Sequence, residues 1–196
     1  MLISEEFVNR LSKLKKICHH FHLSLQSGSN ETLKRMNRSY TTSEFEKIVS
    51  RLRTAYSDCI LTTDIIVGFP GETEKEFEQT YEFLKKIKFY KMHIFKYSIR
   101  KGTKAAEMKN QVLAEVKEDR SNKLLELSDR YEKEYLESYI NKEIEVLFED
   151  KENEFWQGHT SNYLVVKVKS EQDLNNRIIK VKLNEVDGLA LIGKII

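Results

Sequence analysis

The spacing of apolar residues changes near Asn141, and the patterns on its two sides require different folds. Before this point, three segments with strand-like alternation, 21–27, 60–67 and 92–97, are separated by longer helical stretches. Strands separated in this way form right-handed β-α-β units with parallel strands. Beyond it, segments rich in β-branched residues recur at roughly 10-residue spacing, which is typical of a small antiparallel barrel or sandwich. We therefore expect an α/β chain with two parts, the C-terminal portion of a parallel barrel over 1–140 and a small antiparallel β-barrel over 141–196.

The helical stretches show apolar residues at three- and four-residue steps, which is one face of a helix. This periodicity predicts helices over 4–16, 42–56, 73–87 and 112–140. Thr73 followed by Glu76 is a capping box, so the third of these helices should begin at Thr73.

Charge and cysteine content exclude several classes of protein. The 196 residues carry 33 basic and 31 acidic side chains, so the net charge of +2 indicates no particular partner. The two cysteines, Cys18 and Cys59, fit neither a disulfide framework nor a paired-cysteine metal site. No apolar run reaches the roughly 18 residues of a membrane span, and the acidic start, residues 1–6, has no signal-peptide hydrophobic stretch. We expect a cytoplasmic protein without a membrane partner.

Each predicted parallel strand has one polar face. The residues on these faces alternate with apolar ones; they are His22, Ser24, Gln26, Thr62, Asp64, His93 and Tyr97, with Phe95 among them. Polar residues inside a parallel barrel predict a lumen that holds a ligand or water. An antiparallel sheet with one wet face is the alternative interpretation. In a parallel sheet the functional site lies at the carboxyl ends of the strands, here 26–28, 68–72 and 97–98.

Several kinds of active site lack their motifs. There is no GxSxG, Walker loop or HExxH sequence. Asp64 and Glu72 are possible acid and base groups, but their partners do not follow from the sequence, so we assign no catalytic residue. His20 and His22 share a strand face with no cysteine or carboxylate expected nearby, and we predict no metal site there.

Three segments resemble the radical S-adenosylmethionine (SAM) methylthiotransferases. They are LQSGSNETLKRMNRSYTT from Leu25, TTDIIVGFPGET from Thr62 and HIFKYSIRKGT from His93, followed by Gln111-Val112. Within this family, the KRMNR sequence from Lys34 to Arg38, followed by Tyr40-Thr-Thr, is most similar to the branch that methylthiolates N6-threonylcarbamoyladenosine beside the anticodon of tRNA.

The resemblance implies an enzyme with three parts. These are an N-terminal domain with an auxiliary [4Fe–4S] cluster, a radical SAM partial barrel with a second cluster on a CxxxCxxC motif, and a C-terminal TRAM domain that binds RNA. The full enzyme would use SAM to abstract hydrogen from C2 of the adenine and would transfer sulfur from the auxiliary cluster. Neither cysteine triplet is present here. We therefore expect no cluster in this chain and no activity from the chain alone.

The resemblance also places individual residues. Those expected to face SAM are Gln26, Ser27, Arg38, Asp64, Gly68, Phe95 and Tyr97. Those expected to contact RNA are Lys34, Arg35, Arg100, Lys101, Trp156, Tyr163 and Lys167. Two alternatives remain open: Arg38 contacts the SAM carboxylate, a tRNA phosphate or only solvent, and Trp156 belongs either to the RNA-binding surface or to the core.

The expected partner is a tRNA anticodon stem-loop. The alternatives are a truncated, non-catalytic RNA-binding relative and a methylthiotransferase acting on a ribosomal protein. The predicted strand 21–26 has no neighbour on one side, and an open strand edge can pair with another chain. Self-association through this edge is therefore a further prediction.

Overall fold

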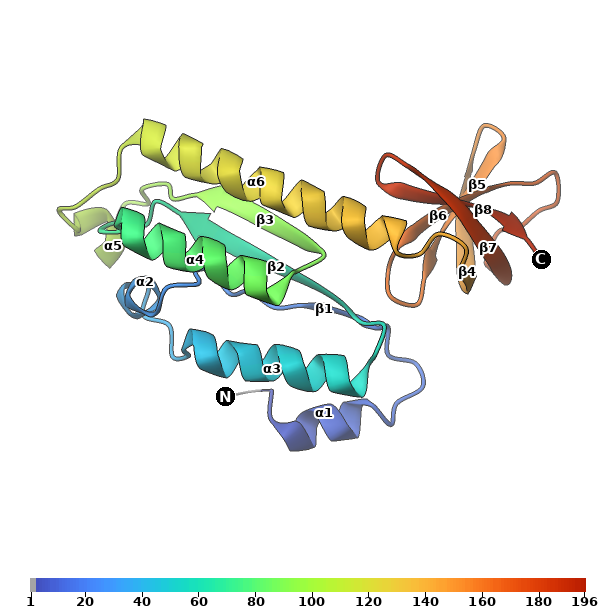
Figure 1. Cartoon of the computed structure of the whole chain (residues 1–196), viewed down its shortest axis with the longest axis horizontal. Coiled ribbons are helices and arrows are strands. Elements are labelled where there is room, and N and C mark those ends of the chain that lie inside the picture. The colour runs from blue at the N-terminus through green and yellow to red at the C-terminus, as the bar shows by residue number, and fades with distance from the viewer. Residues whose placement is uncertain (1–2) are drawn as a thin grey trace.

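One long helix, α6 (Ala114–Glu137), packs along a parallel sheet and leads at its C-terminal end into a closed β-barrel (Figure 1). The structure, a computed structural model, describes residues 3–196. Met1 and Leu2, at the start of the segment considered for a signal peptide, lie outside the described residues. None of the helices in residues 3–196 has the length and apolarity needed to cross a membrane.

The sheet unit contains five helices within residues 3–196, and the first of them ends at Leu11 instead of the predicted residue 16. They are α1 (Glu5–Leu11), α2 (Asn30–Arg35), α3 (Thr42–Ala55), α4 (Glu74–Ile87) and α5 (Lys104–Glu107). Thr73 and Glu76 form the predicted capping box, and Thr41 and Glu44 form a second one before α3. The short helices α2 and α5 were not predicted, because neither is long enough for apolar residues to recur on one face.

The sheet is parallel, in the order β1-β2-β3, and its strands are β1 (His20–His22), β2 (Ile60–Val67) and β3 (Lys91–Lys96). The parallel arrangement excludes the antiparallel alternative. The first strand is shorter than the predicted 21–27, because regular pairing stops at His22 and returns only at a single bridge between Gln26 and Ile65. Between these points a backbone bond from the Leu23 N–H to the Thr62 carbonyl remains, and the Thr63 hydroxyl adds two more contacts: it accepts from the Leu25 N–H and donates to the Leu23 carbonyl. β1 is an edge strand, and self-association through it stays a prediction.

Apolar side chains from the helices and strands form one core on the helix-covered face of the sheet. It includes Leu25, Phe45, Ile65, Phe77 and Leu124, all 5% exposed or less. The other face carries the polar residues of the strands, and several of these are exposed. This division follows from strand geometry, since successive side chains point to opposite faces.

The barrel consists of β4 (Glu143–Glu152), β5 (Phe155–Thr160), β6 (Val165–Lys169), β7 (Arg177–Asp187) and β8 (Ala190–Ile195), closed in the order β4-β5-β6-β8-β7. The expectation of a purely antiparallel barrel is wrong in one respect, because β6 and β8 pair in parallel. Closure requires this pairing: β8 returns antiparallel to β7 and completes the ring against β6. Position 158 accepts only glycine, because the Cβ atom of any other residue would lie 2.1 Å from the Leu147 carbonyl oxygen.

The barrel is joined to the sheet unit by a buried asparagine in its β5–β6 loop. Asn162 is fully buried, and its amide donates to the Asp58 carbonyl at 2.9 Å and to the Tyr139 hydroxyl at 2.7 Å. The backbone N–H of His19 donates to the Ser161 carbonyl at 2.9 Å. The barrel therefore contacts the amino ends of β1 and β2 and leaves their carboxyl ends free.

Candidate functional site

Asp64 is the centre of a polar cluster on the exposed face of the sheet. Its Oδ2 atom lies 3.0 Å from His22 Nε2 and accepts a hydrogen bond of 3.0 Å from Ser24 Oγ. Burial alone would raise the pKa of Asp64, but the bonds from His22 and Ser24 and the nearby imidazoles of His22 and His93 hold it below its ordinary value. Asp64 is therefore a carboxylate on β2 that is hydrogen-bonded to two side chains of the neighbouring segment 22–24.

A carboxylate does lie next to His22, so the sequence-based expectation of none was wrong. His22 pairs with Thr62 across the sheet, and Asp64 follows two residues later on the same face. The Thr62 hydroxyl lies 3.0 Å from His22 Nδ1 and 3.2 Å from His20 Nε2, and so connects the two rings. Burial, and then the neighbouring His22, lower the pKa of His20. The interstrand register that produces this cluster is not readable from one strand alone.

The turn after β1 holds Gln26 in the left-handed region, with φ of 70°. Its N–H donates to the Asp64 carbonyl at 2.8 Å, and its carbonyl accepts from the Ile66 N–H at 2.9 Å, so β2 holds this backbone in place. Such a conformation is costly for a residue other than glycine and is often found at functional sites. Gln26 therefore lies at the carboxyl end of the sheet as predicted, with its side chain 8% exposed.

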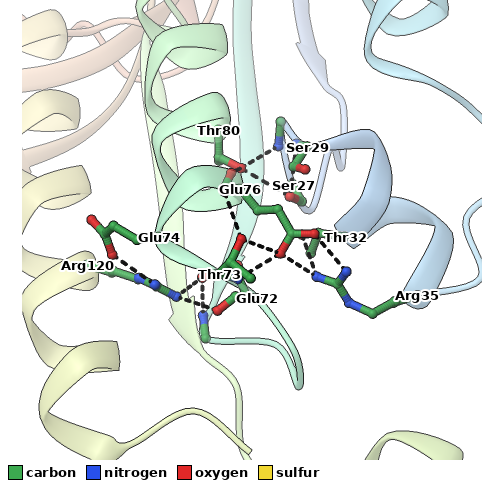
Figure 2. A network of polar contacts seen from close by, with 12 residues as sticks. Ser27, Ser29, Thr32, Arg35, Glu72, Thr73, Glu74, Glu76, Thr80 and Arg120 are labelled. Carbon is green, nitrogen blue, oxygen red and sulfur yellow. Dashed lines mark hydrogen bonds and ion pairs between the residues drawn. The ribbon is translucent and has the colours of Figure 1, made fainter. Parts of the chain in front are cut away.

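Ser27 faces the helix layer instead of the predicted cofactor side. Its side chain is 1% exposed, and its hydroxyl lies 3.2 Å from Thr80 Oγ1 on α4 (Figure 2). The next residue, Gly28, approaches α4 so closely that a Cβ would lie 2.8 Å from Thr80 Cα. The Ser27 hydroxyl is thus a structural group that fixes the turn on α4.

The loop after β2 is held by a buried ion pair (Figure 2). Glu72 Oε1 accepts from the Gly68 N–H at 2.9 Å and from Arg120 Nη1 at 2.7 Å, and Arg120 also reaches Glu74 at 3.0 Å. Burial raises the pKa of Glu72, although the Gly68 N–H and Arg120 act in the opposite direction. These bonds set the backbone of Gly68, at φ of 71°, at the end of β2. Glu72 therefore has a structural role in this loop.

Sequence reasoning did not identify Arg120 as part of this site. A signal was present: Arg120 lies four residues before Leu124, on the apolar face of the predicted helix, where a charged residue requires a buried partner. The partner's identity depends on how α6 packs across the sheet.

The basic residues at the end of α2 and just after it differ in whether their side chains are already paired. Arg35, predicted to contact RNA, instead makes a two-pronged ion pair with Glu76, with both N–O distances 2.8 Å (Figure 2). Lys34 and Arg38 are exposed and line a surface cavity of about 370 Å³ together with Asn30 and Tyr40. Among the three basic residues predicted here, two therefore remain free to contact an anion.

Phe95 and Tyr97, the two aromatic residues expected to face SAM, differ in accessibility. The Phe95 side chain is 53% exposed on the polar face of β3. Tyr97 packs edge-on against Phe69 with ring centroids 5.3 Å apart, and its buried hydroxyl has no partner among residues 3–196. Phe95 thus offers a free ring for stacking, and Tyr97 offers an unsatisfied hydroxyl.

On the barrel, the structure decides between the two interpretations of Trp156. Its side chain is 7% exposed and belongs to the barrel core, so it is not a surface residue for RNA. Tyr163 is 58% exposed and is stacked between His159 and His20, at ring-centroid distances of 4.6 and 5.3 Å. Lys167 is half-buried, and Arg100 and Lys101 are exposed in the segment after β3.

The residues of this chain do not suit an iron–sulfur cluster, but they do suit a ligand such as SAM. An iron–sulfur cluster requires several thiolates, whereas Cys18 and Cys59 are the only cysteines, and burial raises the pKa of Cys59 to about 11. They do not fit a cluster. The exposed face carries the Asp64 carboxylate and the free Phe95 ring, and the buried Tyr97 hydroxyl just after β3 has no partner among the described residues. These groups fit a ligand with hydroxyl groups and an aromatic base.

Sequence comparisons find similarity to radical SAM proteins and to tRNA methylthiotransferases. The model of the radical SAM superfamily matches residues 1–84. The chain is 42% identical to the threonylcarbamoyladenosine tRNA methylthiotransferase MtaB of Bacillus subtilis, over 92% of this chain and 41% of that protein. It is 39% identical to the tRNA-2-methylthio-N(6)-dimethylallyladenosine synthase of Acetivibrio thermocellus, over 99% of this chain and 41% of that protein.

Among solved structures, coproporphyrinogen III oxidase (HemN) from Escherichia coli, a radical SAM enzyme, is similar in fold. The match has a TM-score of 0.56 at 14% identity and covers 66% of this chain and 30% of that one. The chain spans about two fifths of the length of the two curated relatives described above.

Proposed function

We propose that the chain is part of a radical SAM methylthiotransferase, in which it forms the cofactor-facing and RNA-binding part of a tRNA-modifying enzyme. The observation that carries this proposal is the similarity of nearly the whole chain to tRNA methylthiotransferases. The parallel sheet with its polar face and free carboxyl ends supports it, since ligands of parallel folds bind at those ends.

The proposed substrate is the N6-threonylcarbamoyladenosine beside the anticodon of tRNA. The KRMNR segment from Lys34 and the relative from B. subtilis, named for this nucleoside, support this choice. Other relatives, 39% identical or less, are named for N6-dimethylallyladenosine, so that nucleoside is the alternative substrate. A ribosomal-protein substrate has weaker support, because the described relatives are named for tRNA.

In this enzyme, SAM and two [4Fe–4S] clusters would supply the radical chemistry and the methylthio group, and the cysteines that hold the clusters are not in this chain. The chain's own residues would bind and orient SAM. Phe95 would stack on the adenine, Asp64 and Gln26 would meet its hydroxyl and amino groups, and the Tyr97 hydroxyl would gain a partner. Gly68, set by Glu72 and Arg120, would line the same end of the sheet. We assign the chain alone no catalysis.

For tRNA, we propose contacts from both parts of the chain in the cytoplasm. Lys34, Arg38, Arg100 and Lys101 are exposed cations that suit phosphates of an anticodon stem-loop. Tyr163 and Lys167 would contact RNA from a TRAM-like barrel over 141–196. Arg35 and Trp156 are not included, because one is held by Glu76 and the other is in the core.

Two experiments test this function. Deletion of the gene should remove the methylthio group from threonylcarbamoyladenosine, measured by mass spectrometry of tRNA nucleosides. Unchanged 2-methylthio content in all tRNA nucleosides would contradict the tRNA assignment. A change confined to the dimethylallyladenosine derivative would favour the alternative substrate.

The second experiment measures the binding of a fluorescent anticodon stem-loop to this chain at several salt concentrations. Loss of two phosphate contacts in the Lys34→Ala, Arg38→Ala double variant should reduce the slope of log K against log salt by about 1 to 2. The matched control replaces Lys75 and Lys133, exposed cations of α4 and α6, and should leave the slope unchanged. Absence of salt-dependent binding by the unmodified chain would contradict the RNA-binding part of the proposal.

A further inference from the structure

We propose that His22, Asp64 and His93 form a binding site for a divalent first-row transition-metal ion, such as Zn²⁺, on the exposed face of the sheet. The potential ligand atoms of these three residues all lie within 4.8 Å of one another. The inference rests on this geometry and does not depend on the proposed function.

The donor set suits such an ion. Two imidazoles and one carboxylate are ligands that proteins use for Zn²⁺ and for non-haem Fe²⁺. Asp64 lies on β2 and His93 is its direct register partner on β3, while His22 ends β1. The three ligands therefore come from three adjacent, hydrogen-bonded strands, whose backbones hold them in fixed relative positions.

The distances match a metal site that needs only a small adjustment. Ligand atoms at about 2.0–2.1 Å from a tetrahedral ion are separated from one another by roughly 3.3 Å. His22 Nε2 and Asp64 Oδ2 are already 3.0 Å apart. His93 is exposed, and its ring makes no hydrogen bond with any of the described residues, so it is free to rotate toward the other two.

The surroundings also resemble those of metal ligands. A metal-bound histidine usually donates its second ring N–H to a neighbouring group, which fixes the ring orientation. Here His22 Nδ1 lies 3.0 Å from the buried Thr62 hydroxyl, which leaves Nε2 directed at Asp64. Ser24 donates to the Asp64 carboxylate, which orients that ligand. Three protein ligands on an exposed face would leave the fourth position open to water or to a substrate group.

A comparison within the chain distinguishes this cluster from an ordinary histidine–acid pair. His19 pairs with Asp58, and His159 pairs with Glu149. Among the described residues, neither of these pairs has a third metal-ligating side chain within reach, and only the cluster at Asp64 does. A simple hydrogen-bonded pair does not require His93.

The test is titration of the purified, chelator-treated chain with Zn²⁺ by calorimetry and with Co²⁺ by visible absorption. We expect one ion per chain, and tetrahedral coordination should give intense Co²⁺ bands. His93→Ala and Asp64→Asn should each weaken binding by about 100-fold or more, and Thr62→Val, which removes the outer contact, should weaken it by about 10-fold.

Two control variants are expected to bind as the unmodified chain does. His19→Gln removes a histidine of the other His–Asp pair in the sheet unit, and Cys18→Ser removes the exposed thiol. Circular dichroism checks that each variant folds, and His93→Ala changes only an exposed side chain. Unchanged affinity in His93→Ala, loss of binding in Cys18→Ser, or no stoichiometric binding by the unmodified chain would overturn the proposal.

Discussion

The sheet unit and the barrel differ in whether their strands have unpaired edges. The barrel pairs every strand with two neighbours and surrounds an apolar core. The sheet has two edges and one polar face, and the turns at the carboxyl ends of β1 and β2 are fixed by side chains such as Thr80 and Arg120. The stability of the closed barrel therefore depends mainly on apolar packing. The open sheet exposes functional groups on its polar face, and its loops depend on buried polar contacts for their stability.

The largest expected loss of stability comes from a substitution that disrupts the packing of the barrel core. Phe148 is fully buried, and Phe148→Ala should lower the free energy of unfolding by about 3–5 kcal/mol, because it removes buried contacts and leaves a cavity. Denaturant unfolding followed by fluorescence measures this, since the single tryptophan, Trp156, lies in the barrel core. The control is Leu147→Ala, at a position 36% exposed, with an expected loss below about 1 kcal/mol. Equal losses in the two variants would refute the packing argument.

The next largest loss of stability comes from removing the buried ion pair that holds the loop after β2. Arg120→Met leaves the buried Glu72 carboxylate without its cation, and we expect a loss of about 3 kcal/mol. Thermal unfolding followed by far-ultraviolet circular dichroism measures this. Lys123→Met, one turn further along α6, breaks only an exposed pair with Asp119 and should cost less than about 1 kcal/mol. A loss for Arg120→Met no greater than for the control would show that the loop does not need the ion pair.

A third substitution separates the two regions from each other. Asn162→Ala removes the amide donor from the buried Tyr139 hydroxyl and the Asp58 carbonyl and leaves them only the longer contacts with the Tyr135 hydroxyl, at an expected cost of about 1–3 kcal/mol. Tryptophan fluorescence reports the barrel, and circular dichroism reports mainly the helices, so the two transitions should move apart in this variant. In Ser161→Ala, which alters an exposed neighbour, they should stay together. Coincident transitions in Asn162→Ala would contradict its role as the link.

The smallest effect concerns pH and the sheet unit alone. Burial raises the pKa of Glu76, but the bonds from Arg35 and Thr73 outweigh it and leave the pKa below the ordinary 4.5. A carboxyl with a lowered folded-state pKa stabilises the fold above its unfolded pKa, and this contribution disappears as the pH falls through the folded value. We expect Glu76→Gln to cost about 1–2 kcal/mol at pH 7 and to lose stability less steeply below pH 4.5. Glu78→Gln, exposed on the same helix, is the control, and identical acid profiles of the two variants would disprove the effect.

The sequence by itself determined the local elements of this protein. Period and capping signals predicted β2 with its bounds, the start of α4 and the change to short strands after Asn141. These succeed because hydrophobic spacing and caps act between residues close along the chain. The polar faces of the strands were predicted for the same reason, since alternation is a property of a single strand.

The tertiary structure alone decided which side chains meet. It joined Arg120 to Glu72, turned Ser27 toward α4, held Arg35 on Glu76 and placed Trp156 in the core. It also brought His22, Asp64 and His93 together, although the first and the last lie 71 positions apart in the sequence. Such contacts depend on the register between strands and on the packing of helices across them, which are set by the whole fold and not by any one segment.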